Sequence, residues 1–170
     1  MPTLTPVDQP EFLTAIHYVA ARIKESGWAP DFIIGLGRGG LTPAVYLSHA
    51  TGIPMLSVDH SSHLPDFAAE LLVKLAGRSL TDRLLFVDDI NDSGGTIAHV
   101  RSALAEGGGN ADHIRFATLI DNVVSAERVD YRFRTIDRSI NKDWFVFPWE
   151  QLSPVGKVIE DSAIVPARLA

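Results

Sequence analysis

Three carboxylates and a run of small residues follow a short apolar segment near the middle of the chain. Residues 84–87 are Leu-Leu-Phe-Val, and Asp88, Asp89 and Asp92 come next, followed by Ser-Gly-Gly-Thr at 93–96. A short continuous apolar run is typical of a buried parallel strand. A Ser/Gly turn that opens a helix offers several backbone N–H groups to one anion. This order indicates a phosphate ligand that also carries hydroxyl groups, a metal ion or a proton to be moved. The simpler alternative, an aspartate that caps the next helix, explains one of the three acids but not their spacing.

A second glycine-rich segment supports two readings. Residues 35–40 are Gly-Leu-Gly-Arg-Gly-Gly, which matches the G-x-G-x-x-G pattern of dinucleotide-binding folds, and Asp59 lies about where a ribose-binding acid is expected. Arg38 is not a residue that this fingerprint requires, and it suits a pyrophosphate held as an anion. The dinucleotide reading also leaves the acids at 88–92 unexplained.

Residues 84–96 closely resemble the PRPP-binding signature of type I phosphoribosyltransferases, where PRPP is phosphoribosyl pyrophosphate. The resemblance implies that Asp88 and Asp89 hold the ribose hydroxyls, that Asp89 contacts Mg²⁺, and that Asp92 is the general base or acid at N7 of a purine. It also makes residues 36–40 the pyrophosphate loop, with a cis peptide expected at Gly37–Arg38. The PRPP-binding residues that it implies are Asp88, Asp89, Ser93, Gly94, Gly95, Thr96, Gly37, Arg38 and Gly39.

The segment Asp-Trp-Phe-Val-Phe-Pro-Trp-Glu at 143–150 resembles the W-x-x-x-P-W-[DE] stretch of xanthine-guanine phosphoribosyltransferases. That resemblance implies that Trp144 stacks on the base, with Phe145 beside it, whereas we interpret Trp149 as a core aromatic. The sequence departs from this branch at Asn122, which stands where a lysine usually meets the 6-oxo group. An asparagine can donate and accept hydrogen bonds but carries no charge, and Lys142 is the nearby candidate to replace the lysine.

Alternating apolar strands and amphipathic helices predict an α/β fold. Strands are expected at 32–34, 54–58, 84–87, 114–120 and 144–147, and the first and third must be neighbours if one ligand touches both phosphate loops. The sheet order should therefore begin 2-1-3-4. The resemblance implies the type I phosphoribosyltransferase fold, a mostly parallel sheet of about five strands flanked by helices, with a small C-terminal hood within residues 122–170.

The composition fits one domain over residues 1–170, because 46% of the residues are hydrophobic. The net charge of −6 argues against a nucleic-acid partner, and no apolar run is long enough to span a membrane. The chain has no cysteine and no recognisable signal peptide, which is compatible with a cytoplasmic protein. His60 and His63, in the variable segment 60–83, are interpreted as solvated rather than as metal ligands.

The predicted function is a Mg²⁺-dependent phosphoribosyltransferase that joins a 6-oxopurine (xanthine, guanine or hypoxanthine) to PRPP. The products would be the nucleoside monophosphate and pyrophosphate. Family resemblance further implies a homo-oligomer, a dimer or a tetramer. The alternatives are transfer to another nucleobase, a non-catalytic module that binds PRPP or a nucleotide, and a dinucleotide-dependent oxidoreductase.

Overall fold

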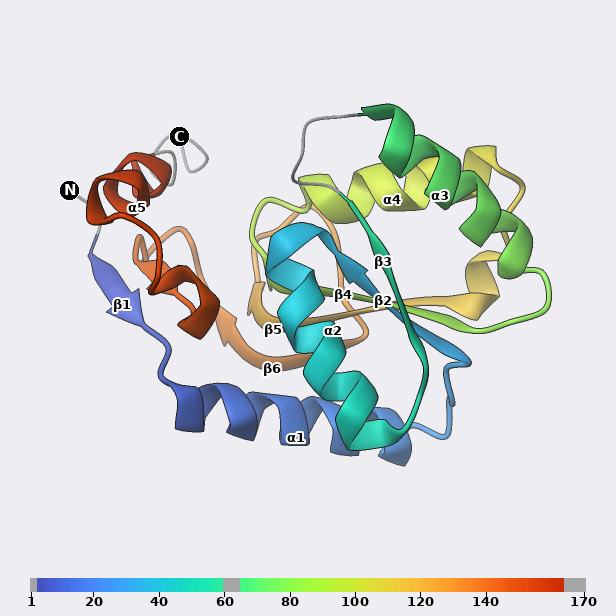
Figure 1. Cartoon of the computed structure of the whole chain (residues 1–170), viewed down its shortest axis with the longest axis horizontal. Helices are drawn as coiled ribbons and strands as arrows, with labels where there is room; N and C mark the ends of the chain where they lie inside the picture. The colour runs from blue at the N-terminus through green and yellow to red at the C-terminus, as the bar shows by residue number, and fades with distance from the viewer. Residues whose placement is uncertain (1–2, 60–64, 164–170) are drawn as a thin grey trace.

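The computed structural model describes residues 3–59 and 65–163, and its centre is a five-stranded sheet in which every neighbouring pair is parallel (Figure 1). The strand order is β3-β2-β4-β5-β6. The strands are β2 (Phe32–Leu36), β3 (Met55–Val58), β4 (Leu84–Asn91), β5 (Ile114–Asn122) and β6 (Tyr131–Ile136).

Helices cover both faces of this sheet (Figure 1). Helices α1 (Gln9–Glu25) and α2 (Gly37–Thr51) pack together on one face, and α3 (Pro65–Arg78) and α4 (Gly95–Glu106) pack together on the other. Each face has its own apolar core, and the sheet contributes alternate residues to the two, such as Leu85 to one and Phe86 to the other. Strands that are buried on both faces explain why the sequence shows continuous apolar runs.

The predicted order 2-1-3-4 is confirmed, since β3, β2, β4 and β5 follow one another across the sheet. The carboxyl ends of β2 and β4 therefore lie side by side, with Gly35 in register with Val87. This is the edge at which open α/β sheets bind their ligands. Within the described ranges, no helix is long and apolar enough to cross a membrane.

The strand expected at 144–147 is present, but it does not belong to the main sheet. The fifth strand of the main sheet is β6, whereas β7 (Trp144–Val146) pairs in parallel with β1 (Leu4–Pro6) in a separate two-stranded sheet. The hood therefore draws on the start of the chain as well as on residues 122–170. The short helices η2 (Pro148–Glu150) and α5 (Val155–Ser162) complete this side of the molecule, and η1 (Ala111–His113) precedes β5 (Figure 1).

The glycine-rich segment is tighter than the predicted loop at 35–40, because β2 ends at Leu36 and α2 begins at Gly37. A side chain at Gly35 would place its Cβ 2.9 Å from the Cα of Leu41, so only glycine lets the helix fold back this closely. The expected cis peptide at Gly37–Arg38 is also wrong for this structure, since all peptide bonds of the described residues are trans. Gly37 turns the chain with a φ of 56° instead.

Candidate active site

The two phosphate loops predicted from sequence meet at the carboxyl ends of β2 and β4. A Cβ at Gly39 would lie 2.6 Å from Oδ2 of Asp89, and a Cβ at Gly40 would overlap the carbonyl of Val87. The N-terminus of α2 therefore rests directly on the acidic strand end. Glycine at these two positions is what allows main-chain N–H groups and carboxylates to face one ligand.

Asp88 and Asp89 form a charged pair in a half-buried position. Burial, reinforced by the neighbouring charge of Asp89, raises the pKa of Asp88 well above its usual range. Burial, followed by the charge of Glu150, raises the pKa of Asp89 to about 7. Two desolvated carboxylates at this strand end favour a ligand that brings hydroxyl donors or a cation.

A metal ion at this edge would need oxygen atoms from a ligand as well as from the protein. Among the described residues, no group of three or more His, Asp or Glu side chains could hold a metal ion. Mg²⁺ is usually bound through one or two carboxylates together with substrate phosphates and water. The pair Asp88 and Asp89 fits that arrangement, because a cation would offset the burial and the neighbouring negative charges that raise their pKa values. His60 and His63 lie outside the described residues.

The anion cradle begins at Gly94, the N-cap of α4, which has a φ of 90°. The loop after β5 supports it from below: a Cβ at Gly94 would lie 2.8 Å from the main-chain nitrogen of Glu127 and 2.9 Å from Oγ of Ser125. Asn91 fixes that loop, because its side chain donates to the carbonyl of Glu127 at 2.9 Å and accepts from Ser125 Oγ at 3.0 Å. The cradle that the sequence predicted at 93–96 thus depends on a loop that the sequence did not single out.

Replacing Gly94 by alanine should lower the free energy of unfolding by about 1–3 kcal/mol, because the side chain must adopt a positive φ and displace the Ser125–Glu127 loop. Gly95→Ala is the matched control. Its Cβ would meet nothing closer than Ser93 Oγ at 3.5 Å, so the change should be neutral or stabilising by about 0.4–1 kcal/mol. Urea unfolding of both variants tests this, and equal stabilities would show that the cradle does not depend on the left-handed turn.

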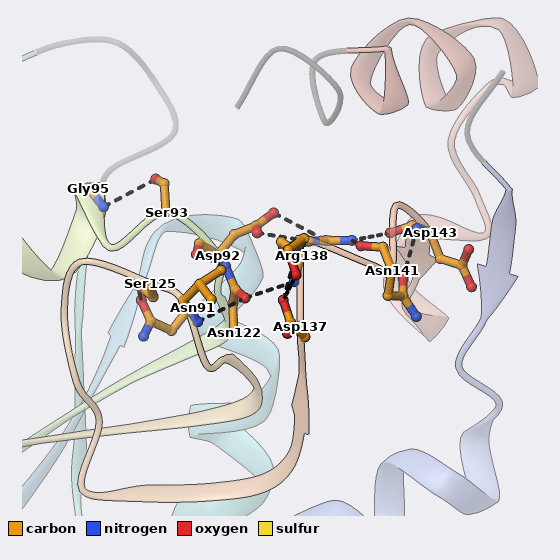
Figure 2. Close-up of polar contacts among 12 residues, drawn as sticks. Asn91, Asp92, Ser93, Gly95, Asn122, Ser125, Asp137, Arg138, Asn141 and Asp143 are labelled. Carbon is orange, nitrogen blue, oxygen red and sulfur yellow. Dashed lines mark hydrogen bonds and ion pairs between the residues drawn. The ribbon is translucent and has the colours of Figure 1, made fainter. Parts of the chain in front are cut away.

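Asp92 does not stand free at the mouth of the cradle. Its carboxylate accepts two hydrogen bonds from the guanidinium of Arg138, at 2.8 Å from Nε and 3.1 Å from Nη2 (Figure 2). Only 2% of the Arg138 side chain is exposed, and its Nη1 donates to the carbonyl of Asp143 at 2.6 Å. The arginine therefore ties the signature loop to the strand of the hood, and it was missed in the sequence because nothing in the polar stretch at 137–143 signals burial.

The hood forms one wall of a second cavity beside the cradle. Trp144 and Phe145 line it, and Glu150 closes it near Asp89. Trp149 does not line the cavity but stacks on Phe147 with ring centroids 4.8 Å apart, as its predicted core role requires. The residues that line the cavity are Asp89, Ile90, Asp92, Arg138, Trp144, Phe145, Phe147 and Glu150.

Asn122 is buried beneath this cavity rather than in its wall. Its amide nitrogen donates to the carbonyl of Asp92 at 2.8 Å, and its amide oxygen accepts from the main-chain nitrogen of Arg138 at 3.0 Å. Both ends of the side chain thus hold the main chain of the Asp92–Arg138 pair. The contact with a base that the sequence suggested for Asn122 has no support in this geometry.

The two cavities share Asp89, Ile90 and Asp92, so they form one continuous site. One half is lined by the residues of the anion cradle from Asp88 to Ile97, and the other half by the aromatic hood. Arg38, exposed on the first turn of α2, faces the same region, because its charge lowers the pKa of Glu150 against the larger effect of burial. A ligand in this site would place an anion in the first half and a flat ring in the second.

Comparison with known proteins agrees with this geometry. Residues 7–151 match the family model of the phosphoribosyl transferase domain. A purine phosphoribosyltransferase from Pyrococcus horikoshii Ot3 superposes with a TM-score of 0.64 and 26% identity, over 89% of this chain and 97% of that one. A xanthine-guanine-hypoxanthine phosphoribosyltransferase from Helicobacter pylori has the same fold, with a TM-score of 0.65 and 17% identity over 94% and 99% of the two chains.

One curated relative is named as a pyrophosphokinase rather than as a phosphoribosyltransferase. The ribose-phosphate pyrophosphokinase 1 of Streptococcus pyogenes serotype M3 is 26% identical over 121 residues, which are 71% of this chain and 37% of that protein. This chain thus spans less than half the length of the curated relatives that it matches.

Proposed function

The chain belongs to the phosphoribosyl transferase domain family, and from this premise we propose that it transfers the phosphoribosyl group of PRPP to a 6-oxopurine. The observation that carries the proposal is the continuity of the two half-sites at Asp89, Ile90 and Asp92. An anion cradle that meets an aromatic cavity at three shared residues suits a substrate with a phosphate at one end and a base at the other.

The roles follow from the position of each group. The N–H groups of Ser93 to Thr96 bind the 5′-phosphate, and Asp88 and Asp89 accept hydrogen bonds from the ribose hydroxyls. Arg38 and the first N–H groups of α2 hold pyrophosphate. Mg²⁺, bound by Asp89 together with ligand oxygens, would neutralise charge between the pyrophosphate and this acidic edge.

In the reaction, the bond between C1 of the ribose and the pyrophosphate oxygen breaks, and pyrophosphate leaves with the electron pair. N9 of the purine forms the new bond to C1, and the purine loses one proton, from N7 in the tautomer that presents a free N9. Asp92 accepts this proton in our proposal, because its carboxylate lies on the boundary between the two cavities. Arg138 fixes the direction of that carboxylate through two hydrogen bonds.

The assay that tests the proposal measures pyrophosphate release from PRPP and Mg²⁺ with xanthine, guanine, hypoxanthine, adenine or orotate, and PRPP binding by calorimetry in parallel. We expect release with at least one 6-oxopurine. Binding of PRPP without release for any base would refute the enzyme. It would support a second candidate, a non-catalytic binding module, which the engagement of Asp92 by Arg138 favours. Pyrophosphoryl transfer to a ribose phosphate, in line with the name of the streptococcal relative, needs a separate assay with ribose 5-phosphate and a nucleoside triphosphate as the donor.

Trp144 should carry much of the affinity for the base. Stacking on an aromatic side chain contributes roughly 1–3 kcal/mol per base, so Trp144→Ala should raise the KM for the base by roughly 5- to 150-fold. The affinity for PRPP should not change. Trp149→Ala is the contrasting variant, because this ring packs edge-on against Phe12 outside the cavity and should affect stability rather than the KM. An unchanged KM in Trp144→Ala would place the base elsewhere.

A further inference from the structure

Arg138 is the most deeply buried cation beside the proposed base site, and four of the five N–H groups of its guanidinium donate hydrogen bonds. A guanidinium has five N–H groups. Nε and Nη2 each donate once to Asp92, and Nη1 donates to the carbonyls of Asp143, at 2.6 Å, and Asn141, at 3.4 Å. Within residues 3–59 and 65–163, the second N–H of Nη2 has no hydrogen-bond partner. Because Arg138 lines the hood cavity, a charged donor is available next to the carboxylate of Asp92.

We propose that Arg138 reads the 6-oxo group of the base and thereby selects 6-oxopurines over adenine. The inference rests on the proposed function and extends it to a residue that determines specificity. On a purine, O6 and N7 share one edge, and arginine pairs with these two atoms of guanine in nucleic-acid recognition. With Asp92 accepting the hydrogen of N7, the spare N–H of Arg138 meets O6. Adenine would present an amino group there, and two donors would face each other.

The position of Asn122 explains how the cation reaches this place. The side chain that stands where the family has its lysine accepts from the main-chain nitrogen of Arg138 and donates to the carbonyl of Asp92. It therefore sets the spacing between the donor and the acceptor that would read the edge of the base. In this chain the positive charge comes from the turn that follows β6. Lys142, the replacement suggested by sequence, does not line the cavity.

The experiment compares Arg138→Gln and Arg138→Lys with the wild type. It measures kcat/KM for hypoxanthine and for adenine, together with PRPP affinity by calorimetry. The matched control is Arg134→Gln. Arg134 lies 4.8 Å above the ring of Phe145 and pairs with Glu11 at 2.6 Å, but it does not line the cavity. A charge-assisted hydrogen bond corresponds to a roughly 10- to 150-fold effect. Arg138→Gln should therefore lower the ratio of kcat/KM for hypoxanthine to that for adenine by this factor, in addition to the loss that both bases share because Asp92 is less well held.

Arg138→Lys keeps a charged donor and should retain part of the preference, while Arg134→Gln should keep the wild-type ratio of the two bases. PRPP affinity should stay within about twofold in all variants, since phosphate contacts lie in the other half of the site. An equal loss of kcat/KM for both bases in Arg138→Gln would mean that Arg138 only supports the structure, which would overturn the inference. A preference of the wild type for adenine would also overturn it. Both results leave the transferase proposal intact. Absence of turnover with every base overturns the transferase proposal and this inference together. If Arg138→Gln does not fold, the inference is tested by the ratio of kcat/KM for hypoxanthine and adenine in the wild type and in Arg138→Lys.

Discussion

Replacing Asp92 by asparagine is expected to lower kcat by roughly 10²- to 10⁴-fold, the usual contribution of a positioned proton acceptor. The affinity for PRPP should remain within about twofold, because the cradle and the ribose-binding acids are untouched. Asparagine has nearly the same shape and keeps one oxygen to accept from Arg138. The expected defect is therefore chemical, and single-turnover kinetics at saturating PRPP would measure it directly.

Asp121→Asn is a suitable control for the loss of a buried negative charge. Asp121 is 4% exposed and pairs with Arg132 at 3.6 Å, and it lines neither half of the site. This variant should change stability but not kcat. Near-normal turnover in Asp92→Asn would mean that the proton leaves by another route, and Asp92 would then only hold Arg138.

The second large effect concerns stability and pH. For Asp89, whose pKa is raised to about 7, the native state binds more protons than the unfolded state between about pH 4, the ordinary value for an aspartate, and pH 7. The free energy of unfolding of the ligand-free protein should therefore fall as the pH rises through this window, by up to about 1.4 kcal/mol per pH unit for one group. Asp88, whose pKa is also raised, acts in the same direction.

Asp89→Asn should make this slope shallower and stabilise the ligand-free protein at pH 8, while it weakens PRPP binding. Mg²⁺ added together with PRPP should recover part of the stability lost at pH 8 in the wild type, and less of it in this variant. Asp112→Asn removes the same charge at an exposed position and should leave the slope unchanged. Denaturant unfolding between pH 5 and pH 8 provides the measurement, and a flat profile for the wild type would contradict the electrostatic account of the strand end.

The parts of the fold and the site that were predicted from sequence are those formed by residues close together along the chain. The apolar run at 84–87 and the glycines at 94–95 located a strand and a helix start correctly, although β4 continues through the two acids to Asn91. The sheet order followed from one geometric requirement, that two phosphate loops reach one ligand, and the structure confirms it.

The parts that were not predicted depend on contacts between distant segments. The strand β6 has alternating polar residues, Arg132 and Arg134 among them, as an edge strand does, and this pattern was overlooked in favour of the apolar run at 144–147. That run does form a strand, but its partner is β1 at the start of the chain, a pairing that no local pattern encodes.

The roles that the structure gives to Arg138 and Asn122 could not be predicted for the same reason. An arginine in a polar turn is usually solvated. Arg138 is buried only because the hood brings the main chain of Asp143 to one side of it and Asp92 to the other. Asn122 was assigned by its place in a family pattern, whereas the structure uses its amide to space two segments that are 46 residues apart.

The most direct test of phosphoribosyl transfer is to identify the products of a single reaction by mass spectrometry. The wild-type protein is incubated with PRPP, Mg²⁺ and hypoxanthine, and both products are quantified over time, with the Asp92→Asn variant in parallel. The account predicts inosine monophosphate and pyrophosphate in equal amounts from the wild type, and a rate lower by roughly 10²-fold or more in the variant. Pyrophosphate without the nucleotide, or no product although PRPP binds, would contradict it.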